Sequence, residues 1–443
     1  MPISPSPSYH KYDVTDYRAV HPDYGTLDDA RELVREAHAR GIAVLLDLVV
    51  NHTASAHPWF QAAAADPESP YRDYDVWATP DEVAARGATR AATADSGNRR
   101  AWHEAEGGDD ALYYGLFGGQ MPDLNFDHPA VRAEMVDVGR FWLEDVGVDG
   151  FRLDAAKHVF PDDRAADNHA WWAEFRAALQ AVRPDVYLVG EVWDRPDVVA
   201  PYLRGLTATF NFDLARDIGR AVRDGRADSL ALRLARVRGA YDAVAPGFRD
   251  ATFLTNHDQT RVLSALGDDE AKARVAAALL LTLPGSPFLY YGEEIGMRGR
   301  KPDPNIREPF LWGGADGLTD TRWTTAVHST PATVASAAAQ EGDAGSLLSH
   351  YRGLIALRNA SAALTHGDLV PLASPPAVAS FLRTFGGDTV WVAHNVTAEA
   401  QTVPVPAALR AFTRVEYPTD GTVRRVGETL VLPPYRSAVL APP

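Results

Sequence analysis

Helical and strand patterns alternate along most of this chain, and that alternation limits the folds open to it more than any other feature. The apolar run 42–50, which follows a helical pattern over 26–40, is typical of a buried parallel strand. The remaining patterns are helices at 130–143, 171–182, 230–241 and 271–283 and strands at 148–154, 186–193, 208–213, 251–258 and 286–292. Such repeated βα units predict an α/β fold with a parallel sheet, either doubly wound or closed as a (β/α)₈ barrel.

Polar residues at the ends of the predicted strands favour the barrel. Asn51, Asp154, Glu191 and Asp258 each close a different strand. Because barrel active sites gather at the carboxyl ends of the strands, we expect these four side chains to face one site.

Two stretches depart from the alternation. Residues 53–118 break into short pieces rich in Pro, Gly, Trp and charge, which is too long for an ordinary βα loop and predicts an inserted small domain. Beyond about residue 365 the helical pattern stops and short alternating runs follow, so residues 365–443 are predicted to form a C-terminal β-sandwich. The barrel itself would then comprise 1–52 and 119–364.

Composition restricts the partners of the chain. With 59 acidic and 43 basic side chains, its net charge is -16, which argues against nucleic acid and anionic membrane surfaces and fits a neutral ligand. The absence of cysteine excludes disulfides, thiolate metal sites and a cysteine nucleophile. No stretch approaches the ~20 apolar residues of a membrane span, and residues 1–13 lack a signal-peptide pattern, so the chain as written is expected to be cytoplasmic.

Carboxyl groups at strand ends suit glycosidic bond cleavage with retention, which needs a nucleophile and an acid/base roughly 5 to 5.5 Å apart. Asp154 lies in GFRLDAAKH, and Arg152 stands two residues earlier on the same strand face, where it would hold Asp154 ionised for attack. Glu191 closes VYLVGEVW, where burial beside other carboxylates would keep it protonated as a general acid. Asp258 in TNHDQ would stabilise the positive charge of an oxocarbenium-like transition state.

Four motifs follow one another along the chain in the order DLVVNH, GFRLDAAKH, GEVW and NHD. They resemble the four signature regions of the α-amylase family of glycoside hydrolases, and YHKYDVTDY, MPDLN and GSPFLYYGEEIG extend the resemblance from residue 9 to beyond 300. The resemblance implies a (β/α)₈ barrel, a domain inserted after the third strand and a C-terminal β domain. It also implies that Asp154 is the nucleophile, Glu191 the acid/base and Asp258 the stabiliser.

The resemblance also implies the residues that bind substrate. The positions that match the family's sugar-binding residues are Tyr12, His52, Arg152 and His257. Tyr12 would stack on the sugar ring at the cleavage subsite, and the two histidines would bind its hydroxyls. Lys157 and His158 resemble an acceptor-side pair of many α-amylases and favour α-1,4-glucans.

Three further residues have less direct roles. Asn51 matches a calcium ligand of many relatives, so calcium is a candidate cofactor, although no cofactor is required by the chemistry. Glu293 and Glu294 are catalytic residue types, but the resemblance places them after the last strand, where structural or rim roles are expected.

The chain departs from the family pattern in two places. Relatives that remove single glucose units usually carry an acidic residue three positions before the matching tyrosine, whereas Tyr9 stands there and weakens the exo-α-glucosidase interpretation. The strand 42–50 matches the family's third strand, so the first strand, first helix and much of the second strand are expected to be missing. A secretion signal would be lost with that portion, and an incomplete barrel with unpaired edges is expected to be poorly soluble or inactive.

The sequence therefore predicts a monomeric enzyme that hydrolyses α-1,4-glucosidic bonds in starch, glycogen or maltooligosaccharides through a covalent glucosyl-Asp intermediate. An α-glucosidase or transglucosylase stays open, because water or a sugar hydroxyl can resolve that intermediate. An inactive truncated hydrolase is the third hypothesis. A non-enzymatic relative, such as the amylase-like ectodomains of amino-acid transporter heavy chains, is disfavoured because all three carboxylates are present. The enzyme would be cytoplasmic as written, or secreted if a segment precedes residue 1.

Overall fold

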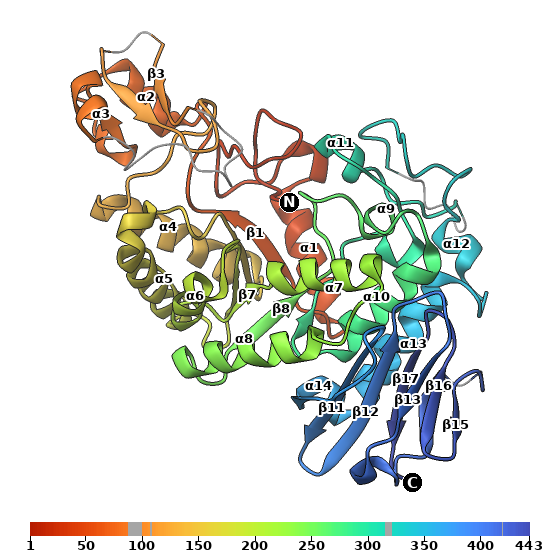
Figure 1. The fold of residues 1–443 in the computed structure, drawn as a ribbon. Helices are drawn as coiled ribbons and strands as arrows, with labels where there is room; N and C mark the ends of the chain where they lie inside the picture. The colour runs from red at the N-terminus through yellow and green to blue at the C-terminus, as the bar shows by residue number, and fades with distance from the viewer. Residues whose placement is uncertain (87–99, 107–108, 315–320, 419) are drawn as a thin grey trace. The chain divides into compact units, whose positions relative to one another are not determined.

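The computed structural model describes residues 1–86, 100–106, 109–314, 321–418 and 420–443, which form two compact units (Figure 1). The first unit comprises Met1–Phe210 and Val244–Phe248, and the second comprises Asn211–Ala243 and Arg249–Pro443. None of the helices in these described ranges is both long enough and apolar enough to cross a membrane.

Parallel strands form the main sheet of the first unit. Its strands are, in order, β1 (Leu45–Val49), β5 (Gly150–Asp154), β6 (Tyr187–Gly190) and β7 (Ala208–Phe210). The helices that alternate with them are α1 (Leu27–His38), α4 (Pro129–Phe141), α5 (Ala165–Gln180) and the short α6 (Pro196–Val199). Val49 pairs with Asp154 and Leu153 pairs with Gly190, so β1, β5 and β6 end at the same edge. Gly150 permits the close approach of β5 to β6, since a Cβ there would lie 2.0 Å from the carbonyl oxygen of Tyr187.

Helix α1 begins where the sequence indicates. The Thr26 hydroxyl accepts the backbone N–H of Asp29, and the Asp29 carboxylate accepts the backbone N–H of Thr26, which completes a capping box. The predicted strand 42–50 is shorter in the structure, where only Leu45–Val49 are extended. Because β1 is the outermost strand of the sheet, its first three residues are half-buried rather than buried on both faces.

The predicted insertion contains a small antiparallel sheet. Its elements are α2 (Pro58–Ala65), β2 (Trp77–Ala78), α3 (Pro80–Arg86), β3 (Trp102–Glu104) and β4 (Leu112–Tyr114), and β4 is the central strand. Isolated bridges pair His52 with Asp123 and Asp75 with Leu124 where the chain enters and leaves this segment. Residues 87–99 and 107–108 of the predicted insertion lie outside the described residues.

The second unit joins βα elements to a β-sandwich. Strands β8 (Arg249–Thr252) and β9 (Ser286–Pro287) pair in parallel. Its helices are α7 (Phe212–Asp224), α8 (Leu230–Val244), α9 (Val262–Ala265), α10 (Glu270–Thr282), α11 (Asp303–Ile306), α12 (Ala337–Gln340), α13 (Leu347–Ala360) and α14 (Ala362–His366).

The predicted C-terminal β-sandwich is confirmed. One sheet has the order β10 (Asp368–Pro371), β11 (Val378–Phe385), β12 (Asp388–Asn395), β17 (Ser437–Ala441) and β14 (Arg414–Tyr417). The other has the order β13 (Gln401–Pro404), β16 (Thr429–Leu432) and β15 (Arg424–Val426). Trp391, Leu430 and Leu440 are fully buried in the core that the two sheets share.

Two predicted strands end early for local reasons. The strand predicted at 208–213 stops at Phe210, because Asn211 caps helix α7 by accepting the backbone N–H of Leu214. The strand predicted at 251–258 ends at Thr252, and the Asn256 side chain then accepts the backbone N–H of Asp258. Asp258 is therefore a loop residue rather than the last residue of a strand.

Candidate active site

Arg152 gathers three carboxylates at the edge where β1, β5 and β6 end. Its Nη1 donates to Asp47 Oδ1 at 2.8 Å and also to Asp154 Oδ1, while its Nη2 donates to Glu191 Oε2 at 2.5 Å. The strands impose this arrangement, because Asp47 pairs with Arg152 across β1 and β5, and Asp154 lies two residues further along the same face of β5. The predicted contact between Arg152 and Asp154 is thus present, and Arg152 also contacts Asp47 and Glu191.

Asp47 is the member of this cluster that the sequence analysis missed. It is the only charged residue of the apolar run 42–50, and its side chain is 7% exposed. A lone carboxylate inside a strand pattern is costly to bury without a partner, and that is the signal that could have identified it.

Tyr12 and His52 lie beside the same cluster. The Tyr12 hydroxyl donates to Asp47 Oδ2 at 2.8 Å, and the Arg152 guanidinium carbon lies 5.6 Å from the centre of the Tyr12 ring. His52 is buried, and burial lowers the pKa of its imidazole to about 4. His52 is therefore neutral near pH 7, and its Nε2 has no hydrogen-bond partner among the residues that the structure describes.

Burial governs the electrostatics of the cluster. It raises the pKa of Asp154 to about 8, and the Arg152 guanidinium opposes that shift, while the charges of Glu191 and Asp47 reinforce it. Arg152 therefore lowers the pKa of Asp154 as predicted, but burial has the larger effect on that pKa. Desolvation and mutual repulsion together favour a cluster that retains a proton near neutral pH.

The acceptor-side residues differ in their surroundings. Lys157 is buried, and its Nζ lies 2.9 Å from Asp194 Oδ2, so its charge is paired within the loop that follows Glu191. His158 contacts the ring of Phe117 edge-on, with the ring centres 5.6 Å apart.

Asp258 and His257 lie together in the second unit. His257 Nε2 is 3.2 Å from Asp258 Oδ2, and Arg307 Nη2 donates to Asp258 Oδ1 at 2.7 Å. The structure thus forms two groups from the predicted residues. Tyr12, Arg152, Asp154 and Glu191 share one cluster in the first unit, and His257 and Asp258 form a pair in the second.

Glu293 and Glu294 occupy a one-turn helix after β9. Glu293 is buried, accepts the Tyr351 hydroxyl at 3.3 Å, and has a pKa that burial raises to about 8. Burial also raises the pKa of Glu294.

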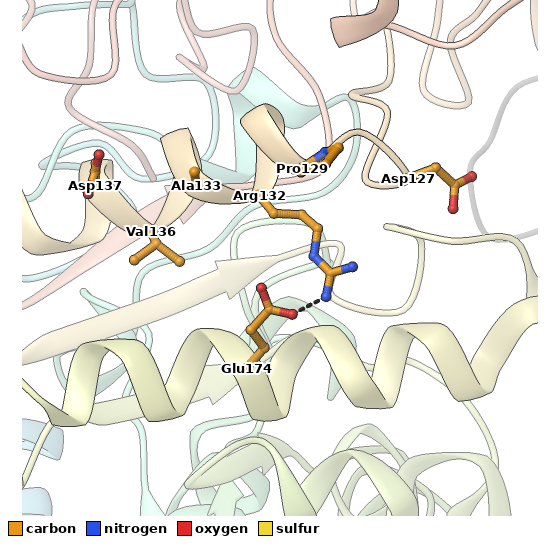
Figure 2. Close-up of a pocket in the computed structure, with 7 residues that line it drawn as sticks. All are labelled: Asp127, Pro129, Arg132, Ala133, Val136, Asp137 and Glu174. Carbon is orange, nitrogen blue, oxygen red and sulfur yellow. Dashed lines mark hydrogen bonds and ion pairs between the residues drawn. The ribbon is translucent and has the colours of Figure 1, made fainter.

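Two surface cavities contain none of the predicted site residues. One of about 380 Å³ lies beside helices α4 and α5, where Arg132 reaches across to pair with Glu174 (Figure 2). The other, of about 410 Å³, is lined by residues of α7 and α8, among them Arg216 and Arg233, which pair with Asp213 and Asp217. The Arg132–Glu174 and Arg233–Asp217 pairs join neighbouring helices, whereas Arg216–Asp213 lies within α7. Neither cavity contains the carboxylate cluster.

Comparison with known proteins identifies the family. Residues 1–367 match the model of the α-amylase catalytic domain. The chain belongs to the α-amylase family of glycoside hydrolases. Residues 378–439 match the C-terminal domain model of the α-amylase SusG. The predicted α/β barrel class is thereby confirmed, and so is the predicted enzyme class.

The relatives of this α-amylase family member include hydrolases and transferases. α-Amylase 3 of Dictyoglomus thermophilum is 42% identical over 400 residues, which cover 89% of this chain and 76% of that protein. The 4-α-glucanotransferase of Thermotoga neapolitana is 36% identical over 356 residues, which cover 79% of this chain and 75% of that protein. The crystal structure of the α-amylase from H. orenii matches with a TM-score of 0.90 at 41% identity, over 100% of this chain and 89% of that one. The family member described here therefore acts on α-glucans by hydrolysis or transglycosylation.

Proposed function

We propose that this enzyme hydrolyses α-1,4-glucosidic bonds of starch, glycogen or maltooligosaccharides with retention, using Asp154 as nucleophile and Glu191 as acid/base. The observation that carries the proposal is the Arg152 guanidinium, whose Nη1 binds Asp154 as well as Asp47 and whose Nη2 binds Glu191. Carboxylates held on one guanidinium are close neighbours, as the short separation of a retaining pair requires.

The reaction would proceed in two steps. The Asp154 carboxylate attacks the anomeric carbon while the Glu191 carboxylic acid protonates the departing glycosidic oxygen, which yields a glucosyl ester and a shortened glucan. Glu191, now ionised, takes a proton from water as the water attacks the same carbon, and Asp154 is released. Asp258 would stabilise the positive charge that develops on the sugar in both steps.

The proposed roles require an ionised Asp154. The contact of Arg152 with Asp154 supports that state, because the guanidinium lowers the pKa of Asp154 against the effect of burial. Retaining catalysis needs one proton for the Asp154 and Glu191 pair, because one group must donate while the other attacks. Three carboxylates and one guanidinium carry two net negative charges, and the Met1 ammonium, 3.3 Å from Asp47 Oδ2, offsets one of them. Burial penalises the charge that remains, and one proton would neutralise it.

The other site residues would bind substrate. Tyr12 would stack on the sugar at the cleavage point, the neutral His52 and His257 would bind hydroxyls, and Lys157 with His158 would contact the acceptor side. The neutral state of His52 suits this role, because an uncharged imidazole can accept a hydrogen bond as well as donate one.

A second candidate function is glucosyl transfer, which the 36% identity to a 4-α-glucanotransferase favours. Transfer needs the same covalent intermediate and differs only in the attacking hydroxyl. Chromatography of the products from maltoheptaose separates the two functions. Hydrolysis is expected to give a range of shorter maltooligosaccharides from the first time points, whereas transfer would give oligosaccharides longer than the substrate. Glucose as the sole early product would contradict cleavage within the chain.

We also propose a structural calcium ion at Asn51, where the insertion leaves the sheet. Asn51 Oδ1 and both carboxylate oxygens of Asp75 are buried and have no hydrogen-bond partner among the described residues. Burial and the nearby Asp123 raise the pKa of Asp75 well above its usual range. Uncharged and charged oxygen donors of this kind are the ligands that Ca²⁺ prefers.

Asn51 and Asp75 would hold the ion, and it would offset the buried charge of Asp75. No group of three or more His, Asp or Glu side chains in the described ranges is arranged to hold a metal, so backbone carbonyls and water would complete the coordination.

Calcium is expected to raise the melting temperature of the wild-type protein after treatment with a chelator, by roughly 1 °C for each kcal/mol of binding free energy in a chain of this size. Asp75→Asn should abolish most of that increase, because it removes the charged ligand. Asp73→Asn, at an exposed position two residues away, is the matched control and should respond like the wild type. Differential scanning calorimetry with and without Ca²⁺ measures both responses. An equal increase in the Asp75 variant, or none in the wild type, would contradict the site.

A further inference from the structure

We infer that Arg307 is a positioning residue that holds the Asp258 carboxylate in its working orientation. The inference rests on the proposed function, which makes Asp258 the stabiliser of the transition state. It concerns residues of the second unit only, and it goes beyond the four sequence motifs, because Arg307 lies outside all of them.

Arg307 binds the loop of Asp258 at two points. Its Nη2 donates to Asp258 Oδ1 at 2.7 Å, and its Nε donates to the backbone carbonyl of His257 at 2.8 Å. The Arg307 side chain is only 5% exposed, so these bonds form away from bulk water. One planar group therefore orients both the carboxylate and the backbone that carries it.

Asp258 lies in a loop, where its Oδ2 is 3.2 Å from His257 Nε2 and its backbone N–H donates to the Asn256 side chain. Strand β8 ends at Thr252, six residues earlier, so the sheet does not fix the position of Asp258 directly. Its side chain is 34% exposed, so packing alone would not confine it to one rotamer. A carboxylate of this kind needs a bonded partner to be preorganised.

Hydrogen bonds fix the backbone on which Arg307 lies. The hydroxyl of Tyr290 donates to the carbonyl of Ile306, and that of Tyr291 donates to the carbonyl of Glu308, so the backbone is held on both sides of Arg307. The fully buried Glu308 carboxylate accepts three successive backbone N–H groups, those of Val327, His328 and Ser329, at 2.6 to 2.9 Å.

Arg307 also contacts a second carboxylate, that of Asp303. Asp303 Oδ2 lies 3.1 Å from Arg307 Nη2, so two carboxylates share one guanidinium. Asp303 also pairs with Lys301, so it has a second cation of its own. The charge of Arg307 is therefore not needed to balance Asp303 alone and is available to hold the Asp258 carboxylate.

The test compares Arg307→Gln and Arg307→Lys with the wild type on maltoheptaose. Arg307→Gln is expected to lower kcat by about 10²-fold, the usual effect of misplacing a catalytic group, while KM changes by less than about threefold. Arg307→Lys should recover only part of kcat, because an ammonium cannot bind the carboxylate and the His257 carbonyl with the same planar geometry. Arg300→Gln is the matched control, since Arg300 is 51% exposed and pairs with Asp268 instead.

A second measurement, the kcat of a double variant, tests whether Arg307 acts through Asp258. Adding Arg307→Gln to Asp258→Asn should lower kcat by less than about threefold further, because the group that Arg307 positions is already disabled. A full additional loss, a rise in KM at constant kcat, or no effect of either single Arg307 substitution would overturn the inference.

Failure of the proposed function can be distinguished from failure of the inference about Arg307. A wild-type protein that does not cleave α-1,4-glucans would reject the proposed function. The contact itself would then be judged from the melting temperatures of Arg307→Gln, Asp258→Asn and the double variant. Coupled effects on melting temperature would show that Arg307 holds Asp258, and additive effects would overturn that claim.

Discussion

Asp154→Asn is expected to lower kcat on maltoheptaose by about 10⁴-fold or more, with little change in KM. The amide cannot form the glucosyl ester, and losing the nucleophile of a covalent mechanism removes most of the rate enhancement. Initial rates of reducing-end formation measure this loss. Mass spectrometry after incubation with a 2-deoxy-2-fluoro glucosyl donor should find a glucosyl unit on the wild-type peptide that contains Asp154, and none on the variant.

Asp163→Asn is the matched control, because Asp163 is exposed and lies outside the Arg152 cluster. Its kcat should equal that of the wild type. A labelled peptide that excludes Asp154, or an Asp154 variant that retains more than about 1% of the activity, would remove Asp154 from the nucleophile role.

The same variant should have a distinctive pH-dependent stability. The folded-state pKa of Asp154 is raised from 3.8 to about 8 by burial, so the folded state disfavours the ionised carboxylate. The wild type should therefore lose stability as pH rises from about 4 to about 8, whereas asparagine does not titrate. The melting temperature of Asp154→Asn should exceed that of the wild type by more at pH 9 than at pH 5.

Glu191→Gln is expected to lower kcat on maltoheptaose by about 10² to 10⁴-fold, the range for loss of a general acid. The loss should be much smaller for the first step of cleavage of an aryl α-glucoside with an acidic leaving group, because that group departs without a proton. Stopped-flow release of the phenol measures this step. Azide should then accelerate turnover and give a glycosyl azide, since it attacks the intermediate without general base help.

The Asp154→Asn variant serves as the counterpart on the same aryl substrate. It should release no burst of phenol and gain nothing from azide as a resolver of the intermediate, because it forms no ester. Equal losses on the aryl glucoside and on maltoheptaose would show that Glu191 does not act through its proton.

Much of the fold follows from local patterns that the sequence displays directly. The capping pair of Thr26 and Asp29 predicts the start of α1, and the spacing of Arg152 and Asp154 on one strand predicts their contact. Both depend on residues two or three positions apart, so no knowledge of distant pairing is needed.

The rest of the site depends on contacts between distant segments. Asp47 joins the cluster through its pairing with Arg152 across two strands, 105 residues apart, and Arg307 reaches Asp258 over 49 residues. The end of β8 at Thr252 could not be predicted from the apolar run, because the run does not show that the Asn256 side chain accepts the backbone N–H of Asp258.

Backbone hydrogen bonds join the two ends of the segment predicted to be an insertion. The Thr53 N–H donates to the Pro122 carbonyl at 3.1 Å, and the Leu124 N–H donates to the Asn51 carbonyl at 2.9 Å. Since the closure is made by backbone, the length and side chains of the intervening segment can change with little added cost of loop closure. We therefore expect this segment to tolerate changes of length and sequence. Changes within the segment would leave the register of β1 and β5 intact.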